Sequence, residues 1–583
     1  MVRYYIGLAS TCHDPAIAIV DSNGQVVFAE ALERYLQNKR AWDVQPDNFY
    51  QIVQLIKSYC DPKAEFVVAS TWSYTNWQIY LYLLFNYFIL GRGNTKSLLR
   101  PSLEKASPFD LSVKTFDWLT LLHFLGLLKV GRNFAFQMRF VFNNDQISFK
   151  RYQHHLTHAA NACYASSFTD AVCIVVDGEG EKGAVSIYSY KDGTIKTVQE
   201  SKNFASLGTF YGTVTSLCGF DWSKGEEWKV MGLAPYGNVD PELYEQMRSL
   251  LEVKGCCLKQ PSRNKLESLL RSIQSRALPT SASYWDAVDI ACTGQQVFAD
   301  VMEELLNNLY KLGISDNLVL SGGCALNSSL NGMILEKTPF KALYVPSAPG
   351  DDGNAIGAAL LAYYEDYPYK SSRTDLQSPY LGSTISKKSL DNMLRFSRIE
   401  HIRHLPGTVH LEAARLLSEG KLLGWVQGRA EFGPRALGNR SILADPRSSN
   451  MKSIINERVK FREEYRPFAP SILHEWGDKY FENYQESPYM ERTLRWHPGV
   501  REQVPAVVHT NSTGRLQTVK REWNEKFYDL IYAFYEITGV PILLNTSLNV
   551  MGKPIIHSLE DALSIFYTIG LDALIIEDYL IEK

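Results

Sequence analysis

The chain has 583 residues, of which 45 % are apolar and 21 % are charged, and its formal net charge is −3. This length is too great for one hydrophobic core and predicts two or three domains of a soluble globular protein. The net charge gives no reason to expect nucleic acid or an anionic membrane as a partner. The nine cysteines form no C-x-x-C pair, which favours reduced thiols over a zinc ribbon or a disulfide framework.

The amino terminus reads directly into a strand-like run and lacks the apolar core of a signal peptide, which predicts a cytoplasmic protein. The most apolar window, residues 77–90, is 14 residues long, whereas a bilayer span needs about 20 residues. A second apolar run covers residues 116–130. We interpret both runs as helices of an insertion packed on the main body; a hydrophobic lid over a substrate cleft is the alternative.

Residues 4–31 and 171–200 share one plan of strand, loop, strand, turn and strand. Ser22-Asn23-Gly24 and Asp192-Gly193 are typical of hairpin turns. In each stretch the first strand runs into a loop that carries Asp, His or Glu. The repeat predicts a duplicated α/β fold on the plan of the actin-like and sugar-kinase-like (ASKHA) ATPases, in which nucleotide binds between the halves.

Helical periodicity covers residues 285–312, and two strand–glycine turn–helix junctions follow at 317–332 and 342–364. Glycine at such a junction lets the backbone approach a ligand, and the first N–H groups of the helix favour phosphate. Residues 366–405 are rich in serine, proline and polar residues, and we interpret them as a linker. A new domain is expected beyond it.

A basic segment lies in that domain, because residues 424–466 contain nine Lys and Arg but five Asp and Glu. The excess predicts a small polyanionic ligand. A solvated charged face is the alternative. A plain surface helix would not tolerate the interruptions at Gly428, Gly433, Pro434 and Gly438.

Four segments, GRAEFGPRALGNRSILADPR, YRPFAPSIL, LLNTSLN and SGGCALN, resemble the NodU/CmcH/TobZ family of O-carbamoyltransferases. The similarity extends over nearly the whole chain. It implies an ASKHA-type domain over residues 1–365, with an aromatic insertion at about 71–140. After the linker it implies a YrdC-like α/β domain over residues 406–583.

The resemblance implies an enzyme that works in two steps. Carbamoyl phosphate and ATP, the latter with Mg²⁺, yield carbamoyl-adenylate in the YrdC-like domain. The ASKHA-type domain then transfers the carbamoyl group to a hydroxyl of a small-molecule natural product, as in antibiotic or toxin biosynthesis. The sequence leaves the acceptor and the oligomeric state open.

Two other functions compete with this interpretation. A tRNA threonylcarbamoyl-type transferase shares both domain types, but it needs a broad basic surface, which the net charge of −3 disfavours. A non-catalytic actin-like ATP-binding protein would need no carbamoyl phosphate, so dependence of ATP/pyrophosphate exchange on that compound distinguishes it.

His154 and His158 lie four residues apart and share one face of the expected helix. Asp177 follows the apolar run VCIVV, and Asp351 lies in the loop PGDDGNAIG. Asp352, in the same loop, is the alternative ligand to Asp351. Two imidazoles and two carboxylates suit Fe, Mn or Zn, and the resemblance implies Fe²⁺ or another divalent transition metal. A purely structural histidine pair is the alternative.

The resemblance marks the dipeptide His13-Asp14 as an active-site feature, and the His13 imidazole can act as a general base for a hydroxyl; a turn residue that forms hydrogen bonds is the alternative for His13. Lys39 matches a family lysine that would neutralise phosphate or orient the acceptor.

Trp228 replaces the glycine that the family usually has in its nucleotide-binding pattern. The nucleotide-binding residues implied for this domain are Glu227, Lys229, Gly322, Gly323 and Asn327.

The YrdC-like elements Lys-x-Arg and Ser-x-Asn appear as the segments KFR and SLN. Arginines can grip phosphate oxygens with two hydrogen bonds, and Lys460 can balance charge on the carbonyl oxygen of the transferring group. Asn545 and Ser547 are expected to bond the carbamoyl amide, and Asn511 stands where the family commonly has Asp. The binding set implied for carbamoyl phosphate and ATP is Arg435, Lys460, Arg462, Arg466, Arg515, Asn545, Ser547 and Asn549.

Overall fold

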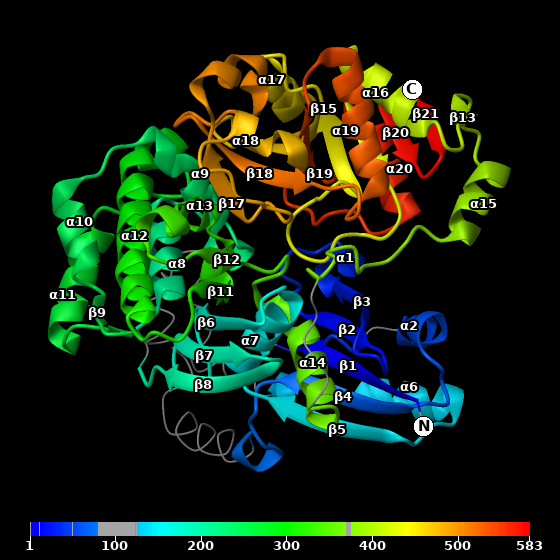
Figure 1. Cartoon of the computed structure of the whole chain (residues 1–583). Helices are drawn as coiled ribbons and strands as arrows, with labels where there is room; N and C mark the ends of the chain where they lie inside the picture. The colour runs from blue at the N-terminus through cyan, green and yellow to red at the C-terminus, as the bar shows by residue number, and fades with distance from the viewer. Residues whose placement is uncertain are drawn as a thin grey trace. The chain divides into compact units, whose positions relative to one another are not determined.

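The computed structural model divides the chain into two compact units, each of mixed α/β structure (Figure 1). The first unit contains Met1–Leu32, Arg40–Leu326 and Ile334–Gln377, and the second contains Glu33–Lys39, Asn327–Met333 and Ser378–Lys583. The structure describes residues 2–10, 12–48, 51–79, 123, 125–203, 205–368 and 375–583. Most of the aromatic insertion expected at 71–140, including Tyr80, Tyr82 and most of the two apolar runs, lies outside the described residues.

The first unit contains two five-stranded sheets whose strands follow the same order. In each sheet an antiparallel meander of three strands is followed by two strands that join in parallel. The first sheet runs β3 (Val26–Ala31), β2 (Ala16–Val20), β1 (Arg3–Ala9), β4 (Glu65–Thr71) and β5 (Ile147–Tyr152). The second runs β8 (Thr194–Glu200), β7 (Val185–Lys191), β6 (Asp170–Val176), β11 (Asn317–Ser321) and β12 (Ala342–Tyr344). The internal duplication expected from the sequence is therefore present in the strand order, and the α/β class is confirmed.

Both predicted hairpin turns are present. Gly24 has φ = +82°, and Asp192 and Gly193 have φ = +48° and +78°. A two-residue turn with both central residues at positive φ matches the right-handed twist of the strands that it joins. The Asp-Gly pair therefore fixes the β7–β8 register locally.

Helix α7 (His154–Ala165) follows β5, and helix α14 (Asn354–Asp366) follows the strand at the equivalent place in the second half, β12. The two helices pack closely, because a Cβ atom on Gly357 would lie 1.9 Å from the carbonyl oxygen of Thr157. Asp351 opens the short 3-10 turn Asp351–Gly353 that leads into α14. This packing helps to hold α7 and the chain around Asp351 in fixed relation.

We expect Gly357→Ala to lower the free energy of unfolding. Helix propensity alone would favour alanine by about 1 kcal/mol, but the added methyl would overlap a backbone carbonyl of α7, and overpacking of this kind costs about 1–3 kcal/mol. Urea unfolding followed by circular dichroism should show a lower midpoint. Gly499→Ala is the control, because a Cβ atom there would meet nothing within 4 Å. An unchanged midpoint for Gly357→Ala would contradict the packing.

The remaining helices of the first unit include the helix expected at 285–312, which is present as α12 (Val288–Tyr310) after a 3-10 turn at Tyr284–Ala287. The others are α2 (Ile52–Tyr59), α6 (Arg132–Phe142), α8 (Leu207–Leu217), α9 (Glu227–Leu233), α10 (Pro241–Arg248) and α11 (Arg263–Gln274).

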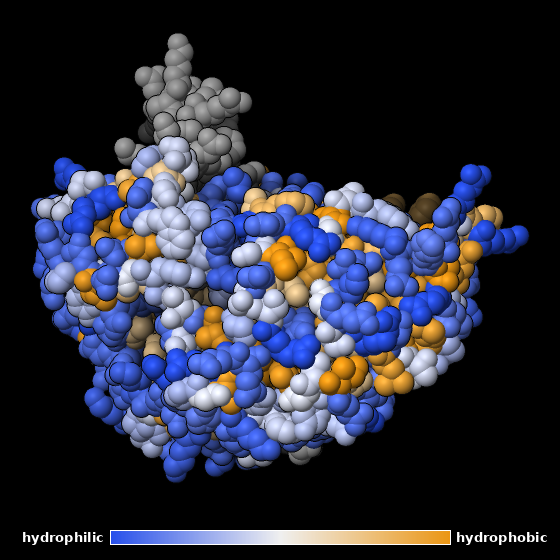
Figure 2. Space-filling view, turned by 90° about the horizontal axis from the view of Figure 1, so that it is seen from above, coloured by the Kyte–Doolittle hydropathy of each residue, from blue (hydrophilic) through white to orange (hydrophobic). Residues whose placement is uncertain are grey.

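Within the described ranges, no helix combines the length and apolar character that crossing a membrane requires. On the face shown in Figure 2, hydrophilic residues predominate and hydrophobic ones are interspersed among them.

The second unit contains a nine-stranded sheet within the described residues. Its order is β13 (Ile402–His404), β21 (Tyr579–Glu582), β20 (Ala573–Ile576), β14 (Leu423–Val426), β15 (Arg440–Ala444), β19 (Ile542–Ser547), β16 (Ala469–Leu473), β18 (Thr513–Val519) and β17 (Arg492–Arg495). Helices α16 (Val409–Ser418), α19 (Glu525–Thr538) and α20 (Leu559–Thr568) contribute to its apolar core. Trp425 and Trp496 are among the largest side chains buried there.

The structure differs from the expected linker over 366–405. The boundary between the units falls between Gln377 and Ser378, and the range beyond it contains α15 (Lys387–Phe396) and β13, which pairs with β21. Both elements leave a weak apolar signal, because α15 fully buries only Met393 among its residues and β13 has three residues. The second unit therefore begins before residue 406.

Candidate functional site

Two histidines and two aspartates converge in the first unit. His154, His158, Asp177 and Asp351 each offer one ligand atom, and these atoms lie within 4.8 Å of one another. Both histidines are on α7, Asp177 directly follows β6, and Asp351 precedes α14. The four residues predicted together are thus brought together, and we call them the His/Asp cluster.

Each histidine directs Nε2 at both carboxylates. His154 Nε2 lies 3.2 Å from Asp177 Oδ2 and 3.4 Å from Asp351 Oδ1, and His158 Nε2 lies 3.3 Å from each of the same two oxygens. Burial alone would lower the pKa of His154, but the carboxylates outweigh burial and raise its pKa to about 10. Burial would raise the pKa of Asp177, but the two imidazoles hold that pKa well below its usual range.

The donor set of the cluster fits a divalent transition metal. His158 is 0 % exposed, and neither of its ring nitrogens forms a hydrogen bond of good geometry with a described residue. A buried ring nitrogen that faces two carboxylate oxygens at 3.3 Å without a well-formed hydrogen bond calls for an explanation such as an ion. Two imidazole nitrogens and two carboxylate oxygens are ligands that Fe, Mn and Zn accept. Asp352 is outside the cluster, where its Oδ1 accepts a hydrogen bond from the Gly353 N–H at 3.0 Å.

Glycines predicted to bind nucleotide hold one ligand of the cluster. The N–H of Gly323 donates to Asp177 Oδ1 at 2.9 Å. Gly322 has φ = +91°, and a Cβ atom there would lie 2.4 Å from the carbonyl oxygen of Val176, so a larger residue would displace the β6 backbone. His155 points elsewhere, as expected, and its Nδ1 lies 2.7 Å from Ser186 Oγ.

Trp72 covers one face of His154. The two rings are stacked with centroids 4.5 Å apart and planes at 20°. Trp72 has φ = +69°, which is an outlier for a bulky residue. The next residue, Ser73, donates its N–H to Glu181 Oε1 at 2.9 Å, and the same carboxylate accepts the N–H of His154. Glu181 therefore ties the chain after β4 to the start of α7.

His13 lies beside the His/Asp cluster. Its Nδ1 is 2.8 Å from Asp14 Oδ2 and 3.5 Å from Asp351 Oδ2. Arg40 contacts both members of the His-Asp pair, with Nη2 at 3.3 Å from His13 Nδ1 and Nε at 3.4 Å from Asp14 Oδ2. Arg40 also donates to the carbonyl oxygen of Trp222 at 3.0 Å.

The residues predicted for nucleotide binding are divided. Glu227 begins α9, where burial raises the pKa of its carboxyl and the nearby Arg40 charge opposes that rise. Lys229 pairs with Glu226 at 2.7 Å and lies 5.8 Å from the centroid of the Trp228 ring. Asn327 belongs to the second unit, where its Oδ1 caps Leu330 N–H at 3.0 Å.

Positive side chains gather in the second unit. Burial lowers the pKa of Lys460, and the charges of Arg462, Arg466 and Lys39 lower it further. Burial likewise lowers the pKa of Arg515, with Arg435, Arg462 and Arg466 adding to the effect. Lys39, predicted with His13 as a catalytic residue, is therefore near the second unit's cations. We call the following set the cation cluster: Lys39, Arg435, Lys460, Arg462, Arg466 and Arg515.

The local backbone around Lys460 explains how its ammonium is held. A π-helical turn at Asn456–Lys460 ends at Phe461, which has φ = +47°; such turns are frequent at functional sites. The Lys460 ammonium donates to the carbonyl oxygen of Ser547 and, at 2.8 Å, to Asn549 Oδ1. The Lys-x-Arg and Ser-x-Asn elements are thus in direct contact.

Arg462 and Arg515 retain donors for a ligand. Arg462 donates through Nε to Asn456 Oδ1 at 2.9 Å and stacks over the Phe468 ring at 4.4 Å, but its buried Nη2 bonds no described residue. The buried Nε of Arg515 likewise forms no hydrogen bond with a described residue. Burial lowers the pKa of Arg435 to about 10. Buried cationic donors of this kind suit an anionic ligand with several oxygens.

The side-chain NH₂ group of Asn545 forms hydrogen bonds with other residues of the protein. Its NH₂ group donates to Ser471 Oγ at 3.1 Å and to Gln517 Oε1 at 3.0 Å. Its Oδ1 is buried and has no hydrogen bond with a described residue. Only this oxygen is left for the carbamoyl amide that the sequence assigns to it.

Two family models match the chain. The model described as Carbamoyltransferase N-terminus matches residues 4–360, and the model described as Carbamoyltransferase C-terminus matches residues 414–583. The chain belongs to the carbamoyltransferase family. The prediction of an enzyme, an O-carbamoyltransferase, is thereby confirmed.

Among its relatives, nodulation protein NolNO of Sinorhizobium fredii is 37 % identical and is matched over 74 % of this chain and 63 % of that protein. Nodulation protein NolO of Bradyrhizobium diazoefficiens is 36 % identical over 74 % of this chain and 78 % of that protein. The crystal structure of full-length HypF in the phosphate- and nucleotide-bound form has a TM-score of 0.35 at 14 % identity and covers 62 % of this chain and 55 % of that one.

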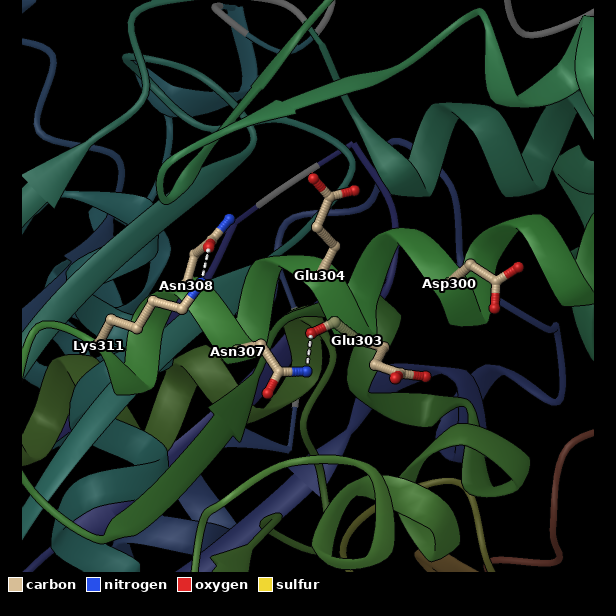
Figure 3. A pocket seen from close by; sticks show the side chains of 6 residues that line it. All are labelled: Asp300, Glu303, Glu304, Asn307, Asn308 and Lys311. Atoms are coloured by element: carbon tan, nitrogen blue, oxygen red, sulfur yellow. Dashed lines mark hydrogen bonds between the residues drawn. The ribbon is translucent and has the colours of Figure 1, made fainter.

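A surface cavity of about 330 Å³ lies on α12 of this carbamoyltransferase. Two of its three acids are already bonded: Glu304 pairs with Arg248 at 2.5 Å, and Asp300 accepts from the Tyr244 hydroxyl at 2.7 Å. Figure 3 shows the lining side chains Asp300, Glu303, Glu304, Asn307, Asn308 and Lys311. No predicted site residue lines this cavity.

Sequence reasoning missed several residues of this carbamoyltransferase that touch its charged sites. Arg40 contacts His13 and was missed, although it is a basic residue one position past Lys39; Asp14, which also contacts His13, belongs to the His-Asp dipeptide that the resemblance already marks. Lys452 and Arg515 lie near His509, whose pKa is lowered to about 3 by burial and by those charges. The two residues missed there, Lys452 and His509, have no spacing that distinguishes them from surface positions.

Proposed function

We propose that this carbamoyltransferase makes carbamoyl-adenylate from carbamoyl phosphate and ATP in its second unit. In its first unit it transfers the carbamoyl group to a hydroxyl of a small-molecule natural product. The observation that carries the proposal is the contrast between the two sites: the second unit has a cation cluster in which Lys460 is buried and the arginines are half-buried, and the first unit has a His/Asp cluster beside a His-Asp pair. The cation cluster suits polyphosphate, and the His/Asp cluster with its neighbouring His-Asp pair suits transfer to a hydroxyl.

In the first step, water displaces phosphate from carbamoyl phosphate, and the resulting carbamate oxygen attacks the α-phosphorus of ATP. Pyrophosphate leaves, with Mg²⁺ accompanying ATP. The set Arg435, Lys460, Arg462, Arg466 and Arg515 holds the phosphate oxygens and balances the charge that develops on them. Ser547, Asn549 and the Oδ1 of Asn545 lie on or beside the strand β19 that Lys460 contacts, and they bond the carbamoyl group.

In the second step, the acceptor oxygen bonds to the carbamoyl carbon, and the bond between that carbon and the oxygen bridging it to the phosphorus breaks, so that AMP leaves with that oxygen. His13 takes the hydroxyl proton at Nε2, while Asp14, which bonds Nδ1, orients the ring and stabilises the imidazolium. Glu227, Lys229, Gly322 and Gly323 are proposed for the nucleotide in this unit, whereas Asn327 and Lys39 belong to the second unit.

His154, His158, Asp177 and Asp351 would hold Fe²⁺ or another divalent transition metal. When bound, such an ion supplies Lewis acidity at the adenylate phosphate. The chain's own contribution is to bury His154, His158 and Asp177, to leave Asp351 only slightly exposed, and to hold both carboxylates ionised, since the imidazoles keep the pKa of Asp351 well below its usual range. A dry site also protects the mixed anhydride from water.

The proposal is tested by exchange of labelled pyrophosphate into ATP. We expect the purified chain with Mg²⁺ to catalyse exchange only when carbamoyl phosphate is present, and acetyl phosphate to give none. Exchange that ignores carbamoyl phosphate, or no exchange under either condition, would contradict adenylation. A screen of hydroxyl compounds for a mass gain of one carbamoyl group then identifies the acceptor.

A further inference from the structure

Asn354, the first residue of α14, is buried beside the His154 imidazole. It is 0 % exposed, and its Nδ2 lies 3.4 Å from His154 Nδ1. Its Oδ1 is also buried, and that oxygen makes no hydrogen bond with any residue in the described ranges. An amide oxygen of this kind is a strong acceptor, so its position next to a histidine of the His/Asp cluster calls for an explanation.

The tautomer of His154 explains the position of the Asn354 amide oxygen. His154 directs Nε2 at Asp177 and Asp351, so a metal held by the cluster would use the Nε2 lone pair. The hydrogen of a neutral ring must then be on Nδ1, where it needs an acceptor. Metal-binding histidines almost always have such a partner for the other ring N–H.

The side chain that faces Nδ1 is Asn354. Half a turn of its amide about χ2 exchanges NH₂ and oxygen, because the two ends of the group have nearly the same shape. The turn brings Oδ1 to Nδ1 and moves the NH₂ to the place that Oδ1 has left. Of the described rings around His154, Trp72 stacks on its face and His158 packs edge-on at 4.8 Å, and neither is recorded as a partner of Nδ1.

We propose that Asn354 is the positioning residue of His154: its amide oxygen accepts the Nδ1 hydrogen when the cluster holds a metal, and this leaves Nε2 unprotonated towards Asp177 and Asp351. The inference rests on the proposed metal site. Trp72 fixes the plane of the ring, and Asn354 fixes which nitrogen carries the hydrogen.

The test uses the full-length chain, freed of metal and titrated with Co²⁺ in competition with a coloured chelator. We expect Asn354→Leu, which keeps the size but removes the acceptor, to weaken Co²⁺ binding about 10- to 100-fold. Asn354→Asp keeps an acceptor oxygen, so its affinity should return to within a few-fold of the unaltered chain. The visible Co²⁺ spectrum should change in the leucine variant and be restored in the aspartate variant.

Asn144→Leu is the matched control. Asn144 is a buried amide of the same unit, and it donates to the carbonyl oxygens of Pro62 and Ala64 at 2.8 Å, with no contact to the cluster. It should lose stability without losing Co²⁺ affinity. If Asn354→Leu does not fold, Asn354→Ala carries the same comparison.

A folded Asn354→Leu that binds Co²⁺ as tightly as the unaltered chain would overturn the inference and leave the metal site standing. Equal weakening in the leucine and aspartate variants would also overturn it, because the acceptor would then not be the cause. If the unaltered chain and His158→Ala bind Co²⁺ equally, the metal site itself fails, and the inference fails with it.

Discussion

His158→Ala should abolish carbamoyl transfer and leave carbamoyl-adenylate formation intact. His158 is fully buried, and its Nε2 lies 3.3 Å from a carboxylate oxygen of both Asp177 and Asp351. Without His158 the cluster keeps one imidazole for two carboxylates, of which Asp177 is buried. Loss of a group that stabilises developing charge costs about 100- to 1000-fold in rate, so we expect transfer from supplied carbamoyl-adenylate to fall by at least about 100-fold.

The measurement pairs elemental analysis with both half-reactions on one folded sample, because loss of a single neutral ligand can leave some metal bound. His155→Ala is the control: it removes the neighbouring imidazole of α7, which bonds Ser186 and lies outside the cluster. His155→Ala should keep transfer. Full metal content and full transfer in His158→Ala would mean that the histidines are structural.

Lys460→Met should have the opposite effect to His158→Ala: it should abolish carbamoyl-adenylate formation and leave carbamoyl transfer intact. The Lys460 ammonium is buried and is held by the Ser547 carbonyl and by Asn549 Oδ1, within the cation cluster. Methionine fills a similar volume but carries no charge. We expect carbamoyl-phosphate-dependent exchange of pyrophosphate into ATP to fall by at least about 100-fold, the cost of removing a charge-stabilising donor, while transfer from supplied carbamoyl-adenylate continues.

Arg458→Met is the matched control for this variant. Arg458 is two residues away on the same turn, its side chain is half exposed, and it pairs with Asp572 at 3.3 Å. Surface ion pairs contribute little, so exchange should be unchanged. Normal exchange in a folded Lys460→Met would remove Lys460 from the adenylation site.

The parts of the site that the sequence predicted are those with a local pattern. The i,i+4 spacing of His154 and His158 placed both on one helix face, and strand ends supplied Asp177 and Asp351. The hairpin turns likewise revealed the duplication of the first unit. Each of these signals lies within a few residues, so periodicity and turn chemistry located the individual residues, whereas the family resemblance favoured their common role as metal ligands.

The remainder depends on contacts between distant segments, which have no local signal. Arg40 reaches Trp222, and the chain segment with Lys39 joins the second unit. Glu431 accepts hydrogen bonds from the N–H groups of Leu437 and Asn439, and so it shapes the loop that carries Arg435. Arg440, counted in the basic segment, bonds backbone carbonyls and is structural.

The division of labour between the two units is tested most directly by one experiment, in which both half-reactions are measured in both His158→Ala and Lys460→Met. We expect a crossed pattern: His158→Ala keeps carbamoyl-phosphate-dependent pyrophosphate exchange and loses transfer, and Lys460→Met loses exchange and keeps transfer from supplied carbamoyl-adenylate. Loss of both half-reactions in both folded variants would contradict separate sites for adenylation and transfer.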